Sequence, residues 1–324
     1  MDEIFLQVLL LTDSTVRLAT PLVLAALAGL FSERSGVVDI GLEGKMLGAA
    51  FAAAAAAQVT GSAWIGLSAA LACSFSLAMV HGFACITHRG DQVVTGVALN
   101  IVVAGLGSTL ADAWFAQAGR VPVTGAGARF APIELPFAEA ARSVPVIGTF
   151  YAEVVSGHNL LVYLAVAALP FTAWVIYRTR FGLRLRAVGE SPEAVDTAGI
   201  AVEWLRYRAL MVTGLLCGAA GAYLSIAQNA GFLRDMTAGK GYLALAALIF
   251  GKWRPVPAVL ACLLFAFTDA LQARLQGTVL PVVGQVPTEA IQALPYLLTI
   301  LLLAGFVGRA VAPRAIGQPY VKER

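Results

Sequence analysis

The sequence predicts an all-α protein, a polytopic integral membrane helical bundle of about nine spans. Of its 324 residues, 59% are hydrophobic and only 13% are charged, which lies outside the range of soluble domains. Long uncharged apolar runs repeat along the chain, and each crossing of the bilayer takes about 20 such residues as a helix. Strand-like alternation is absent, so helices rather than a barrel are expected to satisfy the backbone.

The whole chain, 1–324, is expected to form a single transmembrane domain. Short polar and Gly-containing stretches, such as QVTGSAW, THRGDQ and KWRP, separate the apolar runs. The start, MDEIFLQVLLL, is acidic where a cleavable signal peptide would be basic, so the first apolar segment is expected to stay. The helices are expected at residues 14–31, 42–57, 62–86, 92–115, 158–177, 207–228, 239–251, 256–275 and 289–308.

An odd number of spans places the two termini on opposite sides of the membrane. With the C-terminus inside, fifteen of the 22 Lys and Arg residues lie in inner segments. The positive-inside rule therefore favours an outer N-terminus and a cytoplasmic C-terminus. In this orientation, residues 116–157 form an external loop and residues 178–206 form a cytosolic loop.

Two of the expected helices are too short to span. Residues 42–57 and 239–251 would rise roughly 24 and 20 Å as helices, against a hydrocarbon core of about 30 Å. Each follows a polar, Gly-containing approach, and GLEGKMLGAAFAA resembles TAGKGYLALAALI. They would enter from opposite faces, which predicts an inverted repeat with two broken half-helices and a transport site near the midplane.

The stretch FSERSGVVDIGLEGKML places five charged residues between two apolar runs. The free N–H groups at the start of each half-helix would attract a polar part of a solute. Alternatively, the stretch is a loop under the bundle in which Glu33 or Asp39 pairs with Arg34 and Glu43 is a structural carboxylate. Interhelical hydrogen bonding is an equal alternative for Asn100. The candidate pathway residues are Asp39, Gly41, Glu43, Gly44, Lys45, Asn100, Gly239, Lys240 and Tyr242.

The cytosolic loop contains the signals of a separate short helix. Ser191 can cap it, Pro192 suits its first position, Glu193 favours its dipole and Gly199 suits its end. Such a helix, held outside the bilayer between two spans, has the form of a docking element.

Catalytic chemistry has little support in the sequence. Gly239-Lys240-Gly241 lacks the rest of a phosphate-binding loop, and the three histidines show no metal or acid/base spacing. The four cysteines stand singly in apolar runs and are read as packing residues. We therefore expect no enzyme activity, no cofactor and no metal on this chain, and the dispersed basic residues do not indicate nucleic acid. Any ATP would be hydrolysed by another chain.

Four motifs, ERSGVVDIGLEG, DQVVTGVALN, GLRLRAVGESPEAVDTAGI and TAGKGYLALAALIFGKWRP, occur together in this chain. They resemble the permease subunits of bacterial ABC importers in the branched-chain amino acid and simple-sugar permease superfamily, especially the nucleoside-type permeases. The likeness runs from about residue 14 to 308.

The resemblance implies a pore-forming subunit in the bacterial inner membrane that moves nucleosides or related small polar solutes, such as simple sugars. It implies three kinds of partner besides membrane lipid: cytosolic ABC ATPase subunits, a second homologous permease and an extracytoplasmic substrate-binding protein. Residues 182–199 would be the ATPase-coupling segment. Its implied contacts are Arg184, Arg186, Gly189, Glu190, Ser191, Pro192, Glu193 and Ala194. Where the family often has Asn and Met, this chain has Asp39 and Lys45, so these charges either pair or alter selectivity.

A second hypothesis comes from a different class of transporter. A stand-alone secondary transporter, coupled to ions through Asp39, Glu43 or Asp269, would suit inverted repeats and broken helices equally well. A capped cytosolic helix is not required by that class.

Overall fold

The computed structural model describes residues 3–141, 144, 146–275, 279–280, 284–285, 293, 297, 300 and 311–322. The helix expected at 289–308 lies outside them apart from three isolated residues. The main helices are α1 (Glu3–Arg34), α2 (Leu42–Thr60), α3 (Ala63–Gly82), α4 (Gln92–Phe115), α7 (Leu160–Arg178), α8 (Arg180–Glu190), α9 (Pro192–Thr197), α10 (Val202–Tyr223), α11 (Lys240–Phe250) and α12 (Pro255–Leu275).

Short elements complete the described chain. The helical ones are η1 (Phe83–Thr87), η2 (Ala126–Ala128), α5 (Ala138–Ala141), α6 (Ile147–Phe150), η3 (Tyr151–Val155) and η4 (Leu224–Gln228). The strands are β1 (Val121–Pro122), β2 (Gly231–Phe232), β3 (Val279–Leu280) and β4 (Gly284–Gln285). β1 pairs antiparallel with β2, which joins the expected external loop to the connection between α10 and α11.

Six helices in the described part of the chain are long and apolar enough to cross a membrane. They are α1, α3 with η1, α4, α7, α10 with η4, and α12, while α11 is apolar but shorter. A polytopic helical membrane protein is thus confirmed.

Helix α1 is longer than the expected 14–31. Its first turns contain polar residues that are satisfied within the helix: the Thr12 and Ser14 hydroxyls each donate to the carbonyl four residues earlier, at 2.8 Å. Arg17 also pairs with Asp13 at 3.1 Å. The helix therefore begins at Glu3, before the residue at which the apolar run predicted its start.

The prediction of two half-length helices is correct for α11 and wrong for α2. Helix α11 has 11 residues, whereas α2 has 19 and ends at Thr60 rather than at residue 57. Alanine has the highest helix propensity, so the run Ala52–Ala57 favours continuation. The helix ends where Gly61 adopts a left-handed conformation with φ 69°.

The stretch 178–206, which was expected to be a cytosolic loop, is mostly helical. Thr179 caps α8 by accepting a hydrogen bond from the Gly182 amide at 3.1 Å. The short helix expected after Ser191 is confirmed as α9, with Ser191 accepting from the Ala194 amide and Pro192 at its first position. Helix α10 then begins at Val202, five residues before the expected start.

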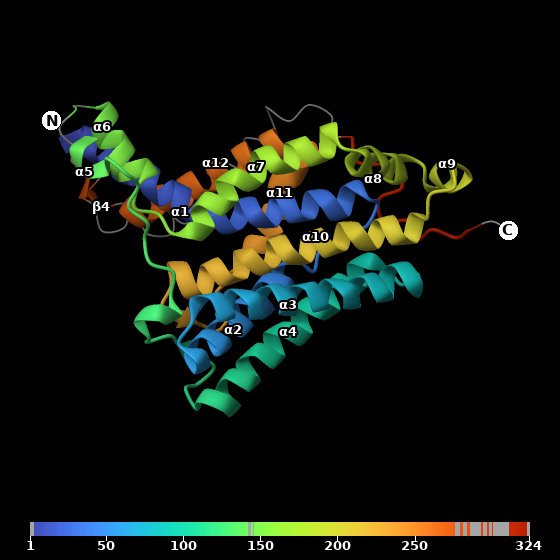
Figure 1. The fold of residues 1–324 in the computed structure, drawn as a ribbon, viewed down its shortest axis with the longest axis horizontal. Coiled ribbons are helices and arrows are strands. Elements are labelled where there is room, and N and C mark those ends of the chain that lie inside the picture. The colour runs from blue at the N-terminus through green and yellow to red at the C-terminus, as the bar shows by residue number, and fades with distance from the viewer. Residues whose placement is uncertain are drawn as a thin grey trace.

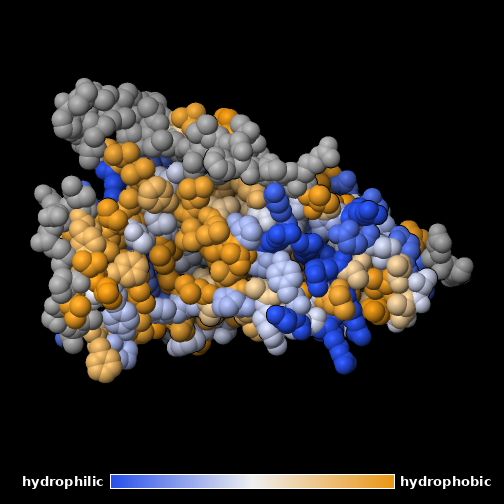
Figure 2. Space-filling view, turned by 90° about the horizontal axis from the view of Figure 1, so that it is seen from above, coloured by the Kyte–Doolittle hydropathy of each residue, from blue (hydrophilic) through white to orange (hydrophobic). Residues whose placement is uncertain are grey.

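The N- and C-termini lie at opposite ends of the molecule (Figure 1). Helices α8 and α9 lie at the C-terminal end, and α5 and α6 lie at the N-terminal end. Hydrophilic side chains gather toward the α8–α9 end, while hydrophobic side chains dominate the other half of the face shown (Figure 2). Along the core, Leu22, Leu24, Leu27 and Leu30 of α1 are all buried, so α1 forms the centre of the bundle.

Candidate functional site

The N-termini of α2 and α11 meet at Glu43. Its carboxylate oxygens accept hydrogen bonds from the backbone amides of Gly239, at 2.8 Å, and Gly241, at 2.6 Å. These amides are among the first N–H groups of α11, which have no partner within their own helix. A carboxylate there also interacts favourably with the positive end of the helix dipole. Glu43 of α2 thus supplies the hydrogen-bond acceptors for the backbone N–H groups at the start of α11.

The two backbones approach so closely that Gly241 admits no larger residue. A Cβ atom at this position would lie 2.6 Å from the Glu43 amide nitrogen and 2.7 Å from its Cα. Contacts this short require the backbone to shift. The junction of the two helices, which we call the α2–α11 junction (residues 40–44 and 239–242), is therefore tightly packed.

The Asn100 side chain of α4 forms hydrogen bonds with both helices of the same junction. Its Oδ1 accepts from the Gly44 amide at 2.7 Å. Its Nδ2 donates to the Ile40 carbonyl at 3.0 Å and to the Tyr242 hydroxyl at 2.9 Å. One amide side chain therefore connects α4, the start of α2 and the start of α11, which is the hydrogen-bonding role considered for Asn100 from the sequence.

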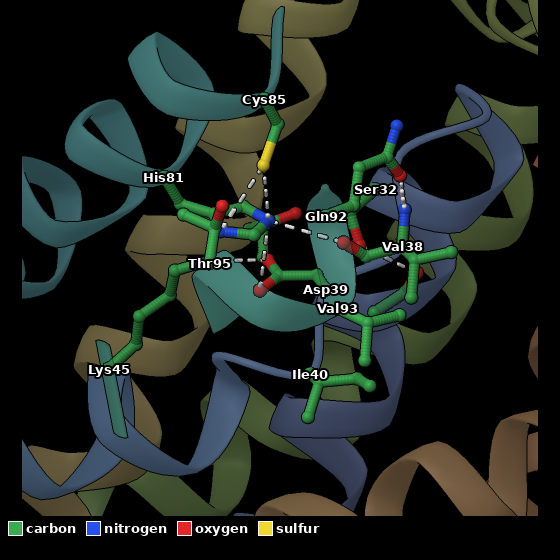
Figure 3. A network of polar contacts seen from close by, with 12 residues as sticks. Ser32, Val38, Asp39, Ile40, Lys45, His81, Cys85, Gln92, Val93 and Thr95 are labelled. Carbon is green, nitrogen blue, oxygen red and sulfur yellow. Dashed lines mark hydrogen bonds and ion pairs between the residues drawn. The ribbon is translucent and has the colours of Figure 1, made fainter. Parts of the chain in front are cut away.

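Asp39 and Lys45 form a buried ion pair beside the junction (Figure 3). Both side chains are 0% exposed. His81 of α3 lies next to the pair, with Nε2 3.2 Å from the Val38 carbonyl and 3.9 Å from Asp39 Oδ1. A buried charge needs a partner, and each of these charges has the other. The pairing option considered for them is therefore the one observed.

The other predicted pathway residues lie at the first positions of α2 and α11. Gly41 is the N-cap residue of α2, and Gly239 is that of α11 with a left-handed φ of 80°. Lys240 is half-buried and interacts electrostatically with Asp269 of α12. Tyr242 is 46% exposed although its hydroxyl is bound by Asn100.

Arg34 pairs with neither Glu33 nor Asp39, so that part of the loop alternative is wrong. Its other part, Glu43 as a structural carboxylate, agrees with the hydrogen bonds of Glu43 to α11. The Arg34 Nε and Nη2 atoms donate to the Trp253 carbonyl at 2.9 and 2.7 Å. The buried Glu33 carboxylate instead accepts from the Trp253 indole N–H. Trp253, just after α11, therefore holds the end of α1 through both its backbone and its side chain.

The expected ATPase-coupling residues divide between two helices and the turn that joins them. Arg184, Arg186, Gly189 and Glu190 lie on α8, Ser191 caps α9, and Pro192, Glu193 and Ala194 begin α9. Arg184, Glu190, Glu193 and Ala194 are exposed, while Gly189 and Pro192 are buried. The Arg186 guanidinium stacks 5.5 Å from the centre of the Tyr177 ring. The exposed members lie on α8 and α9, at one end of the molecule.

Two cavities in the described part of the chain include neither Glu43 nor Asn100. An apolar cavity of about 660 Å³ between α2, α3 and α4 is lined by Gly48, Val103 and Trp114 among others, beginning one helical turn beyond Gly44 and Asn100. A more polar cavity of about 740 Å³ at the N-terminal end includes Arg17, Arg129 and Arg274. The hydrogen bonds of Glu43 and Asn100 close the junction itself.

Comparison with known proteins identifies the family to which this chain belongs. The family model for the branched-chain amino acid transport system permease component matches residues 11–303. The chain belongs to this permease family. It is 39% identical to the guanosine ABC transporter permease protein NupQ of Bacillus subtilis, with 97% of each chain covered. It is 34% identical to the nucleoside ABC transporter permease protein NupC of Lactococcus lactis, covering 94% of this chain and 95% of NupC. It is 35% identical to the putative glucose ABC transporter permease protein TsgC13 of Haloferax volcanii, covering 97% and 98%.

Three residues of this permease chain were missed by the sequence reasoning. Trp253 holds Glu33 and Arg34, His81 lies beside the buried ion pair, and Arg206 is buried at the start of α10. Arg206 gave no usable signal, because the sequence analysis placed it at the end of the loop 178–206, where basic residues are expected, whereas α10 in fact begins at Val202. The partners of Trp253 lie 219 and 220 residues away, and no local pattern indicates contacts of that kind.

Proposed function

We propose that this chain is the pore-forming permease subunit of an ATP-binding cassette importer that moves nucleosides into the cytoplasm. The observation that carries this proposal is the similarity over nearly the full length to NupQ and NupC, whose names specify guanosine and nucleosides. Simple sugars are the second substrate class, because TsgC13, named for glucose, is similar to the same extent.

The energy for transport is proposed to come from separate ATPase subunits that dock on the α8–α9 surface. α9 is a capped helix that extends outside the spans at the end where hydrophilic residues gather. A second, homologous permease and an extracytoplasmic substrate-binding protein complete the proposed complex in the bacterial cell membrane. The proposed topology has nine crossings with inverted repeats, an outer N-terminus and a cytoplasmic C-terminus, in keeping with termini at opposite ends of the molecule.

The α2–α11 junction is proposed as the point where the pathway opens and closes. It brings together backbone amides, a carboxylate and an amide side chain within an apolar bundle. Non-helical backbone and polar groups at this depth are tolerated where they line a pathway or are buried in protein. When the ATPase subunits close on each other, α2 and α11 would move apart at the junction as rigid bodies and would not unfold.

Ion-coupled secondary transport receives less support from the site. Asp39 is neutralised by Lys45, and both Glu43 oxygens are bound by backbone amides. Neither carboxylate is a free ion ligand in this conformation.

The decisive experiment is uptake by proteoliposomes. The chain is reconstituted with its co-purifying ATPase, second permease and binding protein, and uptake of labelled guanosine, adenosine and glucose is measured with internal or external ATP. ATP-dependent uptake of a nucleoside supports the proposal, and preference for glucose moves the substrate to the sugar class. Uptake by this chain alone under an ion gradient, without ATPase, would establish the secondary transporter instead.

A further inference from the structure

The segment 311–322, which we call the C-terminal strap, lies against the α8–α9 end of the bundle. The Ala315 amide donates to the Gly189 carbonyl at the end of α8, at 2.9 Å. Two residues later, the Gly317 amide donates to the Gly36 carbonyl at 3.0 Å. The strap therefore bonds at once to the end of α8 and to the loop between α1 and α2.

Arg206 reinforces this connection from α10. Its side chain is only 1% exposed, its Nε donates to the Ser35 carbonyl at 3.2 Å and its Nη1 donates to the Gln318 carbonyl at 3.2 Å. One guanidinium thus joins the same loop to the same strap. Hydrogen bonds from a charged donor are stronger than those between neutral groups.

The loop is shaped for this contact at Gly36. Its φ of 86° favours glycine, and a Cβ atom there would lie 3.0 Å from the Ala315 carbonyl oxygen and 3.1 Å from Arg206 Nη2. Both the backbone conformation and the available space therefore require glycine where the strap crosses the loop.

The far end of the strap holds α9. Tyr320, 9% exposed, belongs to a hydrophobic cluster with Val188, Val195, Val202 and Leu205 of α8, α9 and α10. Burial, together with the neighbouring Asp196 carboxylate, raises the pKa of the Tyr320 phenol. Lys322 also pairs with Asp196 of α9 at 3.4 Å.

We propose that the C-terminal strap transmits movement of α9 to the loop 35–41, and so to the start of α2 at the junction, with Tyr320 and Arg206 as positioning residues. The proposal rests on the proposed function, in which α9 receives the ATPase movement. A strap attached at both ends makes α9 and the loop move together. The competing route is the direct contact of α8 with α1, where a Cβ on Gly189 would lie 2.3 Å from the Arg34 carbonyl oxygen.

The test uses the complete transporter in proteoliposomes and compares Tyr320→Ala, Tyr320→Phe and Val321→Ala, the last at an exposed neighbouring position. Bound ATPase, ATP hydrolysis and guanosine uptake are measured together. Tyr320→Ala is expected to keep the ATPase bound and hydrolysing while uptake per ATP falls by about tenfold, within the usual range for coupling between two sites. Val321→Ala should match the wild type, and Tyr320→Phe, which keeps the buried ring but loses the hydroxyl beside Asp196, should keep most of the coupling.

A second pair of variants tests the same proposal in case Tyr320→Ala folds poorly. Lys322→Glu places two like charges together where Lys322 is exposed and Asp196 is half-buried. The double variant Lys322→Glu, Asp196→Lys restores the attraction. Uptake per ATP is expected to fall about twofold in the single variant, as for a partly exposed ion pair, and to recover in the double variant. Wild-type coupling in both Tyr320→Ala and Lys322→Glu would overturn the strap and leave the α8–α1 contact as the route.

Amide hydrogen exchange separates this proposal from the proposed function. The strap predicts that Tyr320→Ala increases exchange both in α9 and in residues 36–41, whether or not guanosine is the substrate. An increase confined to α9 would overturn the strap even if uptake is normal. Absence of nucleoside and sugar uptake by the wild type, with exchange raised in both segments, would overturn the proposed function alone.

Discussion

The Lys45 ammonium and the Asp39 carboxylate form an ion pair in which both side chains are fully buried. Removing one partner of such a pair leaves an unpaired buried charge, which typically costs about 3–5 kcal/mol, whereas a neutral pair of similar size costs little. Asp39→Asn and Lys45→Met are each expected to lower thermal stability strongly, and the double variant is expected to recover most of it. Thermal unfolding in detergent measures this.

An exposed ion pair in the same chain provides the control. Arg234 and Asp235 lie 3.7 Å apart with 73% and 68% of their side chains exposed, and Asp235→Asn should change stability by no more than about 1 kcal/mol. If the Asp39–Lys45 double variant were as unstable as the worse single variant, the pair would have a role beyond mutual neutralisation.

Replacing Glu43 is expected to loosen the α2–α11 junction. Glu43→Ala leaves the Gly239 and Gly241 amides without their acceptors, at about 1–3 kcal/mol for each buried unsatisfied group. Glu43→Gln keeps one carbonyl oxygen and should fall between the alanine variant and the wild type. Amide exchange at the start of α11 and thermal unfolding measure the effect. Glu203→Ala, at the exposed start of α10, is the matched control and should be nearly neutral.

Asn100 and Tyr242 permit a graded test of the same junction. Tyr242→Phe removes one hydrogen bond and is expected to lower the free energy of unfolding by about 1 kcal/mol. Asn100→Leu removes that bond together with those to Gly44 and Ile40, so its effect should be larger. Thr109→Ala, exposed on the same helix, should have little effect. Equal losses for Tyr242→Phe and Asn100→Leu would contradict the contribution of the backbone contacts.

Charge reversal at the α8–α9 surface is expected to abolish uptake. The Glu190→Lys, Glu193→Lys variant changes two exposed side chains, so the chain should still insert and purify normally. The loss would come from weaker binding of the ATPase, which co-purification measures directly. Glu134→Lys, exposed near the opposite end of the molecule, should leave both uptake and ATPase binding unchanged. Wild-type transport by the double variant would remove α9 from the coupling route.

Local signals in the sequence were sufficient for several elements. The apolar run bounded by Asp91 and Ala116 predicts α4 with both its ends, because Asp91 caps the helix through the Val93 and Val94 amides. Ser191 and Pro192 likewise define α9. Helix α8 was missed although its cap, Thr179, is local, because its arginines were attributed to a basic inner loop. The signal was present, and its interpretation was wrong.

Other parts of the site depend on contacts distant in the sequence. Glu43 and its partners on α11 are separated by 196 and 198 residues, and Arg206 meets Ser35 across 171 residues. Composition identifies such polar residues as unusual in a membrane protein but does not identify their partners. The charges around residues 33–45 are therefore explained only by the packing of α1, α2, α3 and α11.

If the α2–α11 junction lines the pathway as proposed, the hydrogen bonds of Glu43 also limit how tightly a solute can be held there. A solute that approaches the Gly239 and Gly241 amides competes with a carboxylate already attached to the same chain, so part of its binding energy is cancelled by displacing that carboxylate. Passage through a membrane requires a solute to leave as readily as it enters. In the proposed pathway, an internal competitor of this kind would favour rapid release over retention, and discrimination between similar solutes would then fall to a step before the pore.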